Sequence, residues 1–206
     1  MSFTTYSALQ TTIADYLVRS DLTNPIKDFI TLAEVRLNRD LRIRQMLTYT
    51  TLTMTAATST VTVPSDFLQL RDMHINTTPI SSLEYQSPSA FFRNTRATDS
   101  GTPKQFTNVG SSFTFAPKPD LAYVLQILYY AKPAVLSDAN TSNVWLANCP
   151  DAMLYAAMAE AETYLMNDAR LQYWAALYDK AIGSLTASDD SGENSGSPLS
   201  ISVVSR

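Results

Sequence analysis

Apolar side chains recur at intervals of three and four residues in the first part of the chain. Within residues 4–19 the spacing is carried by Tyr6, Leu9, Ile13 and Leu17. It predicts an amphipathic helix. Asn24-Pro25 is typical of a helix start, with asparagine as the N-cap and proline at the first helical position. A second stripe follows at Ile26, Ile30, Ala33, Leu37 and Leu41. The two segments together predict a helical hairpin.

The same periodicity returns after residue 147. Asn148 or Asp151 can cap a helix that runs through about Leu165. Its apolar face is Leu154, Met158, Ala161 and Leu165, and a stripe of small residues is Ala152, Ala156, Ala159 and Thr163. Asn167-Asp168 then caps a further helix, whose apolar face is Leu171, Trp174, Tyr178, Ala181 and Leu185. These segments predict a second helical hairpin.

Between the two helical regions the pattern changes to alternation. Residues 48–63 are rich in threonine and β-branched side chains, which predicts a hairpin or strand pair. LQLRDMHI and ISSLEY continue the sheet, and one helical turn is expected around 89–93. QFTNV and SFTFAP flank Gly110-Ser111 and predict another hairpin, and residues 121–131 form the strongest strand signal.

The order of elements predicts an α+β fold: a helical bundle of two helical hairpins with an inserted antiparallel β region. The expected domains are 1–47 (N-terminal hairpin), 48–131 (β region), 132–187 (connector and C-terminal hairpin) and 188–206 (extended C-terminal arm). The arm begins as a polar stretch that cannot bury itself. It continues into LSISVV, residues 199–204, in which apolar residues alternate with serine as in a strand.

Composition and charge limit the function classes. The chain has 206 residues, 45% of them hydrophobic, and no apolar run long enough to span a membrane. Residues 1–135 carry 12 basic and 10 acidic side chains, and residues 136–206 carry 3 and 9, which gives +2 and −6 and the net −4. An acidic chain is a poor free-standing ligand for nucleic acid. A single cysteine excludes an internal disulfide and indicates folding in a reducing cytoplasm.

Candidate catalytic chemistry is sparse. His74 is the only histidine and Cys149 the only cysteine, so no cluster of these two types can bind a metal. Glu160 and Glu162 are two residues apart on a helix and point away from each other. No glycine-rich phosphate loop is present. The sequence therefore predicts a protein that is not an enzyme, with no catalytic residues, metal or cofactor.

Four arginines, Arg36, Arg39, Arg42 and Arg44, lie within nine residues. On a helix the first three lie opposite the apolar stripe, in the company of Leu32, Val35 and Ile43. The helix is expected to end or bend just before Arg44. Three interpretations stay open: a protein–protein interface, a second intramolecular face, or a nucleic-acid contact. Aliphatic side chains among arginines favour the interface.

Several segments in order resemble the head-to-tail adaptor proteins of short-tailed bacteriophages. They are DFITLAEVRLNRDLRIRQM, VPSDFLQLRDM, the stretch from Gly101 to Lys132, and LQYWAALYDKAIGSL. The resemblance implies a structural virion protein, made in the host cytoplasm and placed at the head–tail junction. Such proteins form a ring, commonly of twelve copies, between the portal and the tail nozzle. The ring extends the DNA channel without sequence-specific DNA binding and without contact to a membrane.

The resemblance also gives roles to particular residues. The expected subunit or portal interface comprises Leu32, Val35, Arg36, Arg39, Arg42 and Ile43. The C-terminal segments of this kind of protein clasp the portal, which implies a portal-binding arm of Pro198, Leu199, Ile201, Val203 and Val204. LSISVV would add as a strand to a portal edge. A linker of about twelve residues, 186–197, would reach up to ~40 Å.

Three alternatives remain from the sequence. A DNA-contacting accessory protein would use the arginine-rich helix on phosphates. An enzyme, for instance a tail-associated hydrolase, lacks a recognisable constellation. A tail-tip or receptor-binding module would bind its ligand through residues 48–131 alone.

Overall fold

The computed structural model describes residues 3–95 and 99–193. The described chain is mixed α+β, which confirms the predicted class, with six α-helices and two four-stranded sheets. It divides into a helical unit, residues 1–45 and 133–206, and a β unit, residues 46–132.

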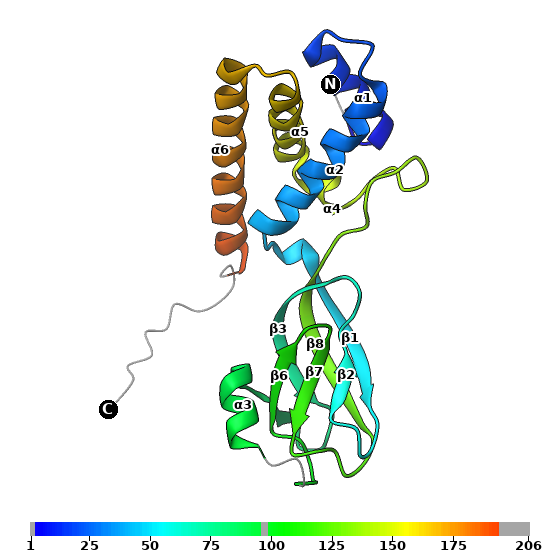
Figure 1. Cartoon of the computed structure of the whole chain (residues 1–206), viewed down its shortest axis with the longest axis vertical. Coiled ribbons are helices and arrows are strands. Elements are labelled where there is room, and N and C mark those ends of the chain that lie inside the picture. Colours follow the sequence, from blue (N-terminus) through cyan, green and yellow to red (C-terminus); the bar gives the residue numbers. More distant parts are fainter. Residues whose placement is uncertain (1–2, 96–98, 194–206) are drawn as a thin grey trace, which may run out of the picture. The chain divides into compact units, whose positions relative to one another are not determined.

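The helical unit is built around α5. Its α-helices are α1 (Tyr6–Leu17), α2 (Thr23–Asp40), α4 (Val144–Asn148), α5 (Pro150–Tyr164) and α6 (Asp168–Glu193). Helix α5 packs mainly against α6 and α2, with which it lies side by side (Figure 1). Alanine and methionine occupy most of its buried positions, so neighbouring helices approach it on several sides. Three of the four residues in each predicted stripe of α5 are buried and serve this packing, whereas Thr163 is exposed and Leu165 follows the helix end.

The two N-terminal helices form close to where the periodicity predicts them. Every residue of the two predicted apolar stripes is buried, which confirms those faces. The Thr5 hydroxyl accepts a hydrogen bond from the Ala8 backbone N–H (3.3 Å) and caps α1. The predicted cap of α2 is wrong by two residues, because the N-cap is Leu22 and Asn24 lies inside the first turn. Pro25 is tolerated there because a first-turn N–H has no partner within the helix.

Two features of the C-terminal helices differ from the prediction. Asn143 caps a short helix, α4, by accepting the Leu146 N–H, and the sequence analysis missed this helix. Helix α6 continues through Glu193, although the composition turns polar from Ser184. The arm predicted for 188–206 is therefore helical in its first six residues. Of the predicted linker, 186–197, the first eight residues are therefore helical, and the other four lie outside the described residues.

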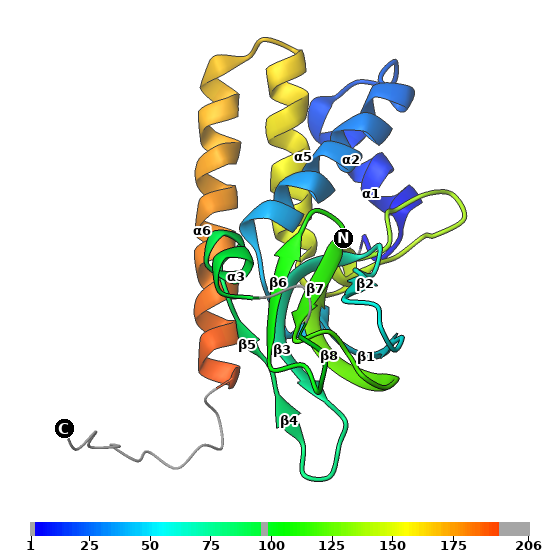
Figure 2. The ribbon, with the colours of Figure 1, turned by 60° about the horizontal axis from the view of Figure 1, so that its bottom comes forward.

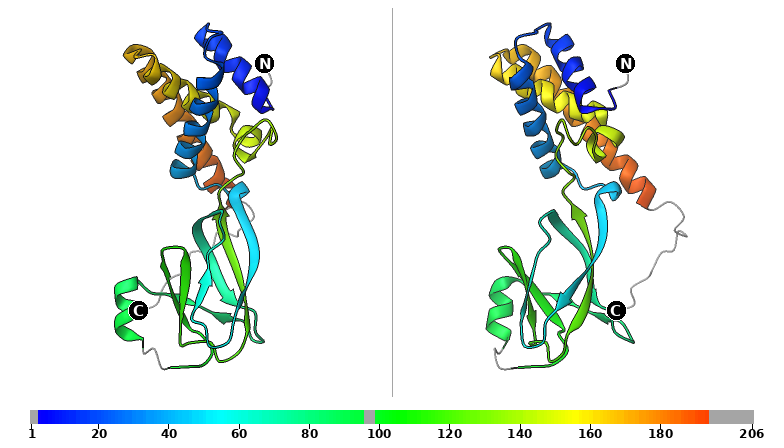
Figure 3. Two further views of the ribbon diagram at one scale, coloured as in Figure 1. Left: turned by 45° about the vertical axis from the view of Figure 1, so that its right-hand side comes forward. Right: turned by 90° about the vertical axis from the view of Figure 1, so that its right-hand side faces the viewer.

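The β unit consists of two sheets that face each other (Figure 3). The first, in the order β1-β8-β3-β4, comprises β1 (Leu47–Met54), β8 (Tyr123–Ala131), β3 (Phe67–Ile75) and β4 (Ser81–Ser82). The second, in the order β2-β7-β6-β5, comprises β2 (Thr60–Thr62), β7 (Ser112–Ala116), β6 (Gln105–Val109) and β5 (Glu84–Tyr85). A 3₁₀ turn (Arg44–Met46) precedes β1, and α3 (Pro88–Asn94) follows β5.

Some strand predictions hold and others are wrong. The hairpin around Gly110-Ser111 is confirmed as β6–β7, with Gly110 at a φ of 61° that suits glycine. The predicted pairing within residues 48–63 is wrong, because β1 pairs with β8 while β2 pairs with β7 in the other sheet. ISSLEY is likewise divided between the sheets. Its second half, β5, pairs with β6 in parallel, against the expected antiparallel region.

The facing sides of the two sheets supply the core of the β unit. Its buried residues are Met54, Met73, Ile75, Phe106, Phe113, Phe115, Leu125, Ile127 and Tyr129. Strand β8, the strongest strand prediction, lies between β1 and β3 in the middle of its sheet. The Tyr129 hydroxyl donates to Asp66 at 2.9 Å. Burial is the main cause that raises the pKa of Tyr129 to about 12, so its hydroxyl stays protonated at neutral pH.

Candidate interaction surface

One side of α2 presents large apolar side chains to solvent. Leu32 is 49% exposed and Val35 is 42% exposed. Arg39 is exposed and has no hydrogen bond or ion pair with any described residue. Spacings of three and four place these three residues in one line along the helix. We call Leu32, Val35 and Arg39 the α2 outer stripe. It combines two aliphatic side chains with an uncompensated positive charge.

Arg36 does not belong to this stripe, because it is half-buried and contacts other residues of the helical unit. Its guanidinium carbon lies 4.1 Å from the ring centre of Tyr178 on α6, and its Nε lies 3.8 Å from Asp40 Oδ2. The Tyr178 hydroxyl donates to the same carboxylate oxygen at 2.7 Å. Burial, followed by this hydrogen bond, raises the pKa of Tyr178 above its ordinary value. For Arg36 the geometry supports the second-intramolecular-face interpretation.

Arg42 and Ile43 do not lie on a helical face. Helix α2 ends at Asp40, before Arg44 as expected, and Leu41 is already extended. The Arg42 Nη1 donates to the carbonyl oxygens of Asn38 (2.7 Å) and Leu41 (2.6 Å), which would otherwise lack a donor at the helix end. Ile43 is only 4% exposed. Placing Ile43 on the open face of a continuing helix was therefore wrong, because the backbone turns and buries it.

Arg44 links the segment after α2 to the end of α6. Its backbone N–H lies 3.2 Å from both carboxylate oxygens of Asp189, and its Nε lies 2.9 Å from one of them. The guanidinium lies directly against Gly192, in the space that a Cβ atom would need. This contact accounts for a helical structure in the polar stretch after Ser184. Three of the four arginines thus have partners within the helical unit.

Two buried carboxylates were missed by sequence reasoning. Glu34 is buried, and its Oε1 accepts hydrogen bonds from the Leu136 N–H (3.0 Å) and Asn143 Nδ2 (2.6 Å), which fasten the connector to α2. Glu162 is fully buried and forms an ion pair with Arg170 Nε at 2.9 Å. Glu34 directly follows Ala33 and Glu162 directly follows Ala161, and both alanines belong to predicted buried stripes. This position in the sequence could have indicated that the two carboxylates are buried. Buried carboxylates are retained when paired.

The comparison with protein families decides the class of protein. Residues 4–202, nearly the whole chain, match the family described as SU10 adaptor protein. This chain belongs to that family. The family is one of phage head-to-tail adaptors, so the resemblance read from the sequence is confirmed. No curated protein matches the chain. Membership in the SU10 adaptor family makes this a bacteriophage structural protein of the head–tail junction.

Cys149 and His74, the two candidate residues for catalytic chemistry, both have contacts within the folded adaptor. Cys149 is fully buried, and burial followed by the nearby Asp151 charge raises the pKa of its thiol to about 12. A thiol with so high a pKa is a weak nucleophile at neutral pH. His74 contacts Gln126 Oε1 (2.7 Å) and Asp72 Oδ2 (3.2 Å) through its two ring nitrogens.

The remaining site prediction falls beyond the described part of the adaptor. The proposed portal-binding residues Pro198, Leu199, Ile201, Val203 and Val204 lie outside the described residues. Among the residues that are described, no helix is both long and apolar enough to cross a membrane.

Proposed function

We propose that this adaptor forms a ring, of twelve copies, between the portal and the tail nozzle, and that the ring extends the DNA channel. The observation that carries the proposal is the α2 outer stripe. Two exposed aliphatic side chains beside an arginine without a partner among the described residues match the composition of protein interfaces. The stripe is the contact between neighbouring subunits.

The charge distribution supports an acidic surface of the neighbouring copy as the partner of the stripe. Residues 136–206 carry 3 basic and 9 acidic side chains, a balance of −6. Exposed Asp179 on α6 is one of these acids. A contact between α2 of one copy and the acidic region of the next joins two different surfaces, and such a contact closes into a ring when the rotation allows. Arg39 is the cation available for it.

The arginines give little support to DNA binding. Arg36, Arg42 and Arg44 have intramolecular partners, so of the four only Arg39 is left for an external phosphate among the described contacts. Affinity for DNA grows with the number of phosphates neutralised. A channel through which DNA must slide is also served by weak contacts. We therefore assign the DNA a passive path without sequence-specific binding.

The C-terminal segment contacts the portal in the assembled junction. Residues 199–204 alternate apolar side chains with serine, which suits a strand added to an exposed sheet edge. The tether between Glu193 and this segment is five residues, 194–198. Its reach of ~18 Å restricts the acceptor to a portal surface close to the end of α6. Many copies of a weak arm on one ring act through effective concentration.

Electron microscopy of the adaptor mixed with the portal of its own phage tests the ring. Arg39→Glu should abolish stacked rings, because it places a negative charge against the acidic surface of the neighbour. Circular dichroism should show an unchanged fold, since Arg39 has no partner among the described residues. Lys104→Glu, an equal charge reversal at an exposed position of the β unit, is the matched control and should leave rings intact.

Two results would contradict the proposal. Rings that persist in Arg39→Glu would exclude the α2 outer stripe as the subunit contact. A portal that stays bare with the unmodified chain would exclude the adaptor ring itself, and steeply salt-dependent binding to duplex DNA would then support the accessory-protein alternative. A chain ending at Glu193 keeps every described residue, and loss of portal binding in it would locate the clasp.

A further inference from the structure

One edge of the β unit is left open because its outer strands are very short. Strand β3 pairs with β8 over its whole length, but with β4 only at His74 and Ile75. Strand β5 is also two residues long and pairs with β6 only at its start (Figure 2). Residues 67–73 of β3 therefore have no strand partner on the β4 side among the described residues. An open edge of this kind is a template for another strand.

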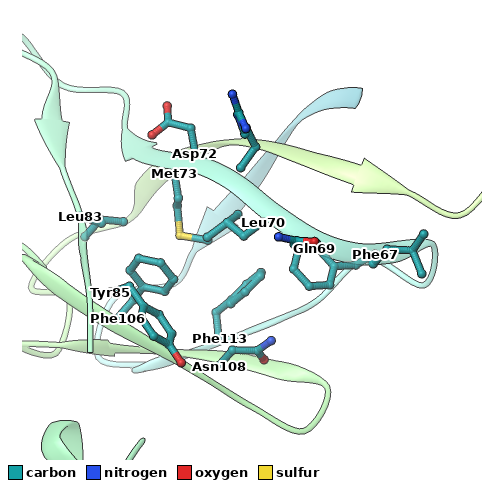
Figure 4. Close-up of a pocket in the computed structure, with 12 residues that line it drawn as sticks. Phe67, Gln69, Leu70, Asp72, Met73, Leu83, Tyr85, Phe106, Asn108 and Phe113 are labelled. Atoms are coloured by element: carbon teal, nitrogen blue, oxygen red, sulfur yellow. The ribbon is translucent and has the colours of Figure 1, made fainter. Parts of the chain in front are cut away.

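A groove lies between the two sheets beside this edge. Its volume is about 580 Å³, and its apolar walls come from both sheets. Figure 4 shows Leu70 and Met73 of β3 on one side and Tyr85, Phe106 and Phe113 on the other. The pairing of β3 with β8 shifts register after Phe67 and again after Leu70. As a result, the β3 side chains that pack against the core of the β unit are three residues apart: Phe67, Leu70 and Met73. The bulges thus direct apolar side chains of β3 into the groove.

The groove also contains a polar group that has no partner. Asn108 Oδ1 is shielded from solvent and accepts no hydrogen bond from any described residue. A shielded acceptor without a donor is costly, and it is satisfied when a donor enters the groove. Tyr85 on the rim is 57% exposed. The site therefore suits an extended peptide with apolar side chains on one face and backbone N–H groups to donate.

We propose that the β3 edge and this groove bind residues 199–204 of a second copy of this chain as an added strand. Residues 199–203 alternate apolar residues with serine, so Leu199, Ile201 and Val203 enter the groove, and the serines and Val204 lie on the opposite side of the strand. Its six residues extend over ~20 Å, which matches the seven-residue open stretch 67–73. Main-chain hydrogen bonds supply affinity, and the alternate side chains supply specificity.

The pairing deepens the proposed function and rests on it for the presence of a neighbouring copy. An open β edge and an apolar strand-like segment both promote aggregation when they are left uncovered. Binding of one to the other between neighbouring copies covers both. The portal then competes for the same segment, so the arm exchanges one edge for another during assembly.

Fluorescence anisotropy with a labelled peptide of residues 198–206 tests the site on the full chain. The receptor carries Ile201→Asp, which prevents its own segment from occupying the groove. We expect saturable binding of the native peptide and of a Ser202→Asp peptide, and none of an Ile201→Asp peptide, because only the apolar face enters the groove. Adding Leu83→Asp on the groove wall to the receptor should abolish binding, whereas adding Val124→Asp, an exposed position on β8, should not.

Mixing two variants that each carry one cysteine in addition to native Cys149 tests the second copy, because a cross-link between the two added cysteines joins two chains. Gln69→Cys and Ser202→Cys should form a disulfide-linked dimer, whereas Thr51→Cys on the opposite edge strand β1 should not form one with Ser202→Cys. Native Cys149 is buried. Absence of peptide binding, or equal binding to a Leu83→Asp receptor that circular dichroism shows to be folded, would overturn the site. Peptide binding without the cross-link would contradict the proposal that the bound segment comes from a second copy.

Neither measurement requires the portal. If the peptide did not bind or the cross-link did not form, the evidence from microscopy for rings on the portal would still stand. Conversely, a bare portal in the microscopy experiment would leave the peptide-binding result intact, so the two proposals fail separately.

Discussion

Tyr178 shows how single side chains assign roles within the arginine-rich helix. Its ring packs under the Arg36 guanidinium, and its hydroxyl donates to Asp40 on the same helix α2. The three side chains tie α2 to α6, so Arg36 has a function inside the subunit. Arg39, three residues further along the helix, has no such partner among the described residues. Neighbouring arginines of one run thus have different surroundings: Arg36 is held within the subunit, and Arg39 is exposed.

Tyr178→Phe should lower the free energy of unfolding by about 1–2 kcal/mol, because it removes a hydrogen bond to a carboxylate and keeps the ring. Urea unfolding followed by circular dichroism measures the change. Tyr173→Phe is the control, since Tyr173 is 60% exposed and should change the unfolding free energy by less than about 0.5 kcal/mol. Equal effects of the two substitutions would exclude the Asp40 hydrogen bond as a source of stability.

At the scale of elements, α6 shows that composition alone does not end a helix. The residues after Ser184 are polar, yet the helix continues through Glu193. Asp189 receives the Arg44 backbone N–H and guanidinium, and Gly192 leaves space for that guanidinium. A helix end that lacks an apolar face is stabilised here by a residue 145 positions earlier in the chain. This contact holds the C-terminal end of α6 against the segment that follows α2.

Asp189→Ala should loosen the last turns of α6 and cost about 1 kcal/mol of stability, because the Arg44 N–H and guanidinium lose their acceptor. Hydrogen exchange of residues 186–193 should become faster, while exchange in the first half of α6 stays unchanged. Asp179→Ala, an exposed change on the same helix, serves as the control. Unchanged exchange at the helix end in Asp189→Ala would show that Arg44 does not hold it.

At the scale of the whole molecule, the chain forms two units, one of them inserted into the other in sequence. Residues 46–132 are continuous, whereas the helical unit needs residues from both sides of the insertion. The nine core residues of the β unit all come from that unit. A unit with its own core is expected to fold separately. The helical unit can form only when both of its chain segments are present.

A fragment of residues 46–132 should therefore fold alone and give a dispersed NMR amide spectrum. Cooperative thermal unfolding of the fragment would support the same conclusion. A fragment of residues 1–45 should lack stable structure, because α2 packs mainly against α5 from the other segment. A poorly dispersed amide spectrum for residues 46–132 would mean that the β unit depends on the helical unit for its stability.

The sequence by itself determined most of the helices and strands and the family. Helical stripes and the Gly110-Ser111 hairpin were predictable because their spacing records local geometry, in which residues a few positions apart share a face. The α2 outer stripe was predictable for Leu32, Val35 and Arg39 for the same reason. Ile43 was not, since the helix ends before it and the backbone buries it.

Only the tertiary structure decided which segments meet. The division of residues 48–63 between two sheets, the helical state of 188–193 and the contacts of Arg36 and Arg44 all depend on partners distant in the chain. The groove beside β3 exists because β4 and β5 stop after two residues each. Local periodicity records which side of an element is apolar, and it carries no information about the surface that covers that side.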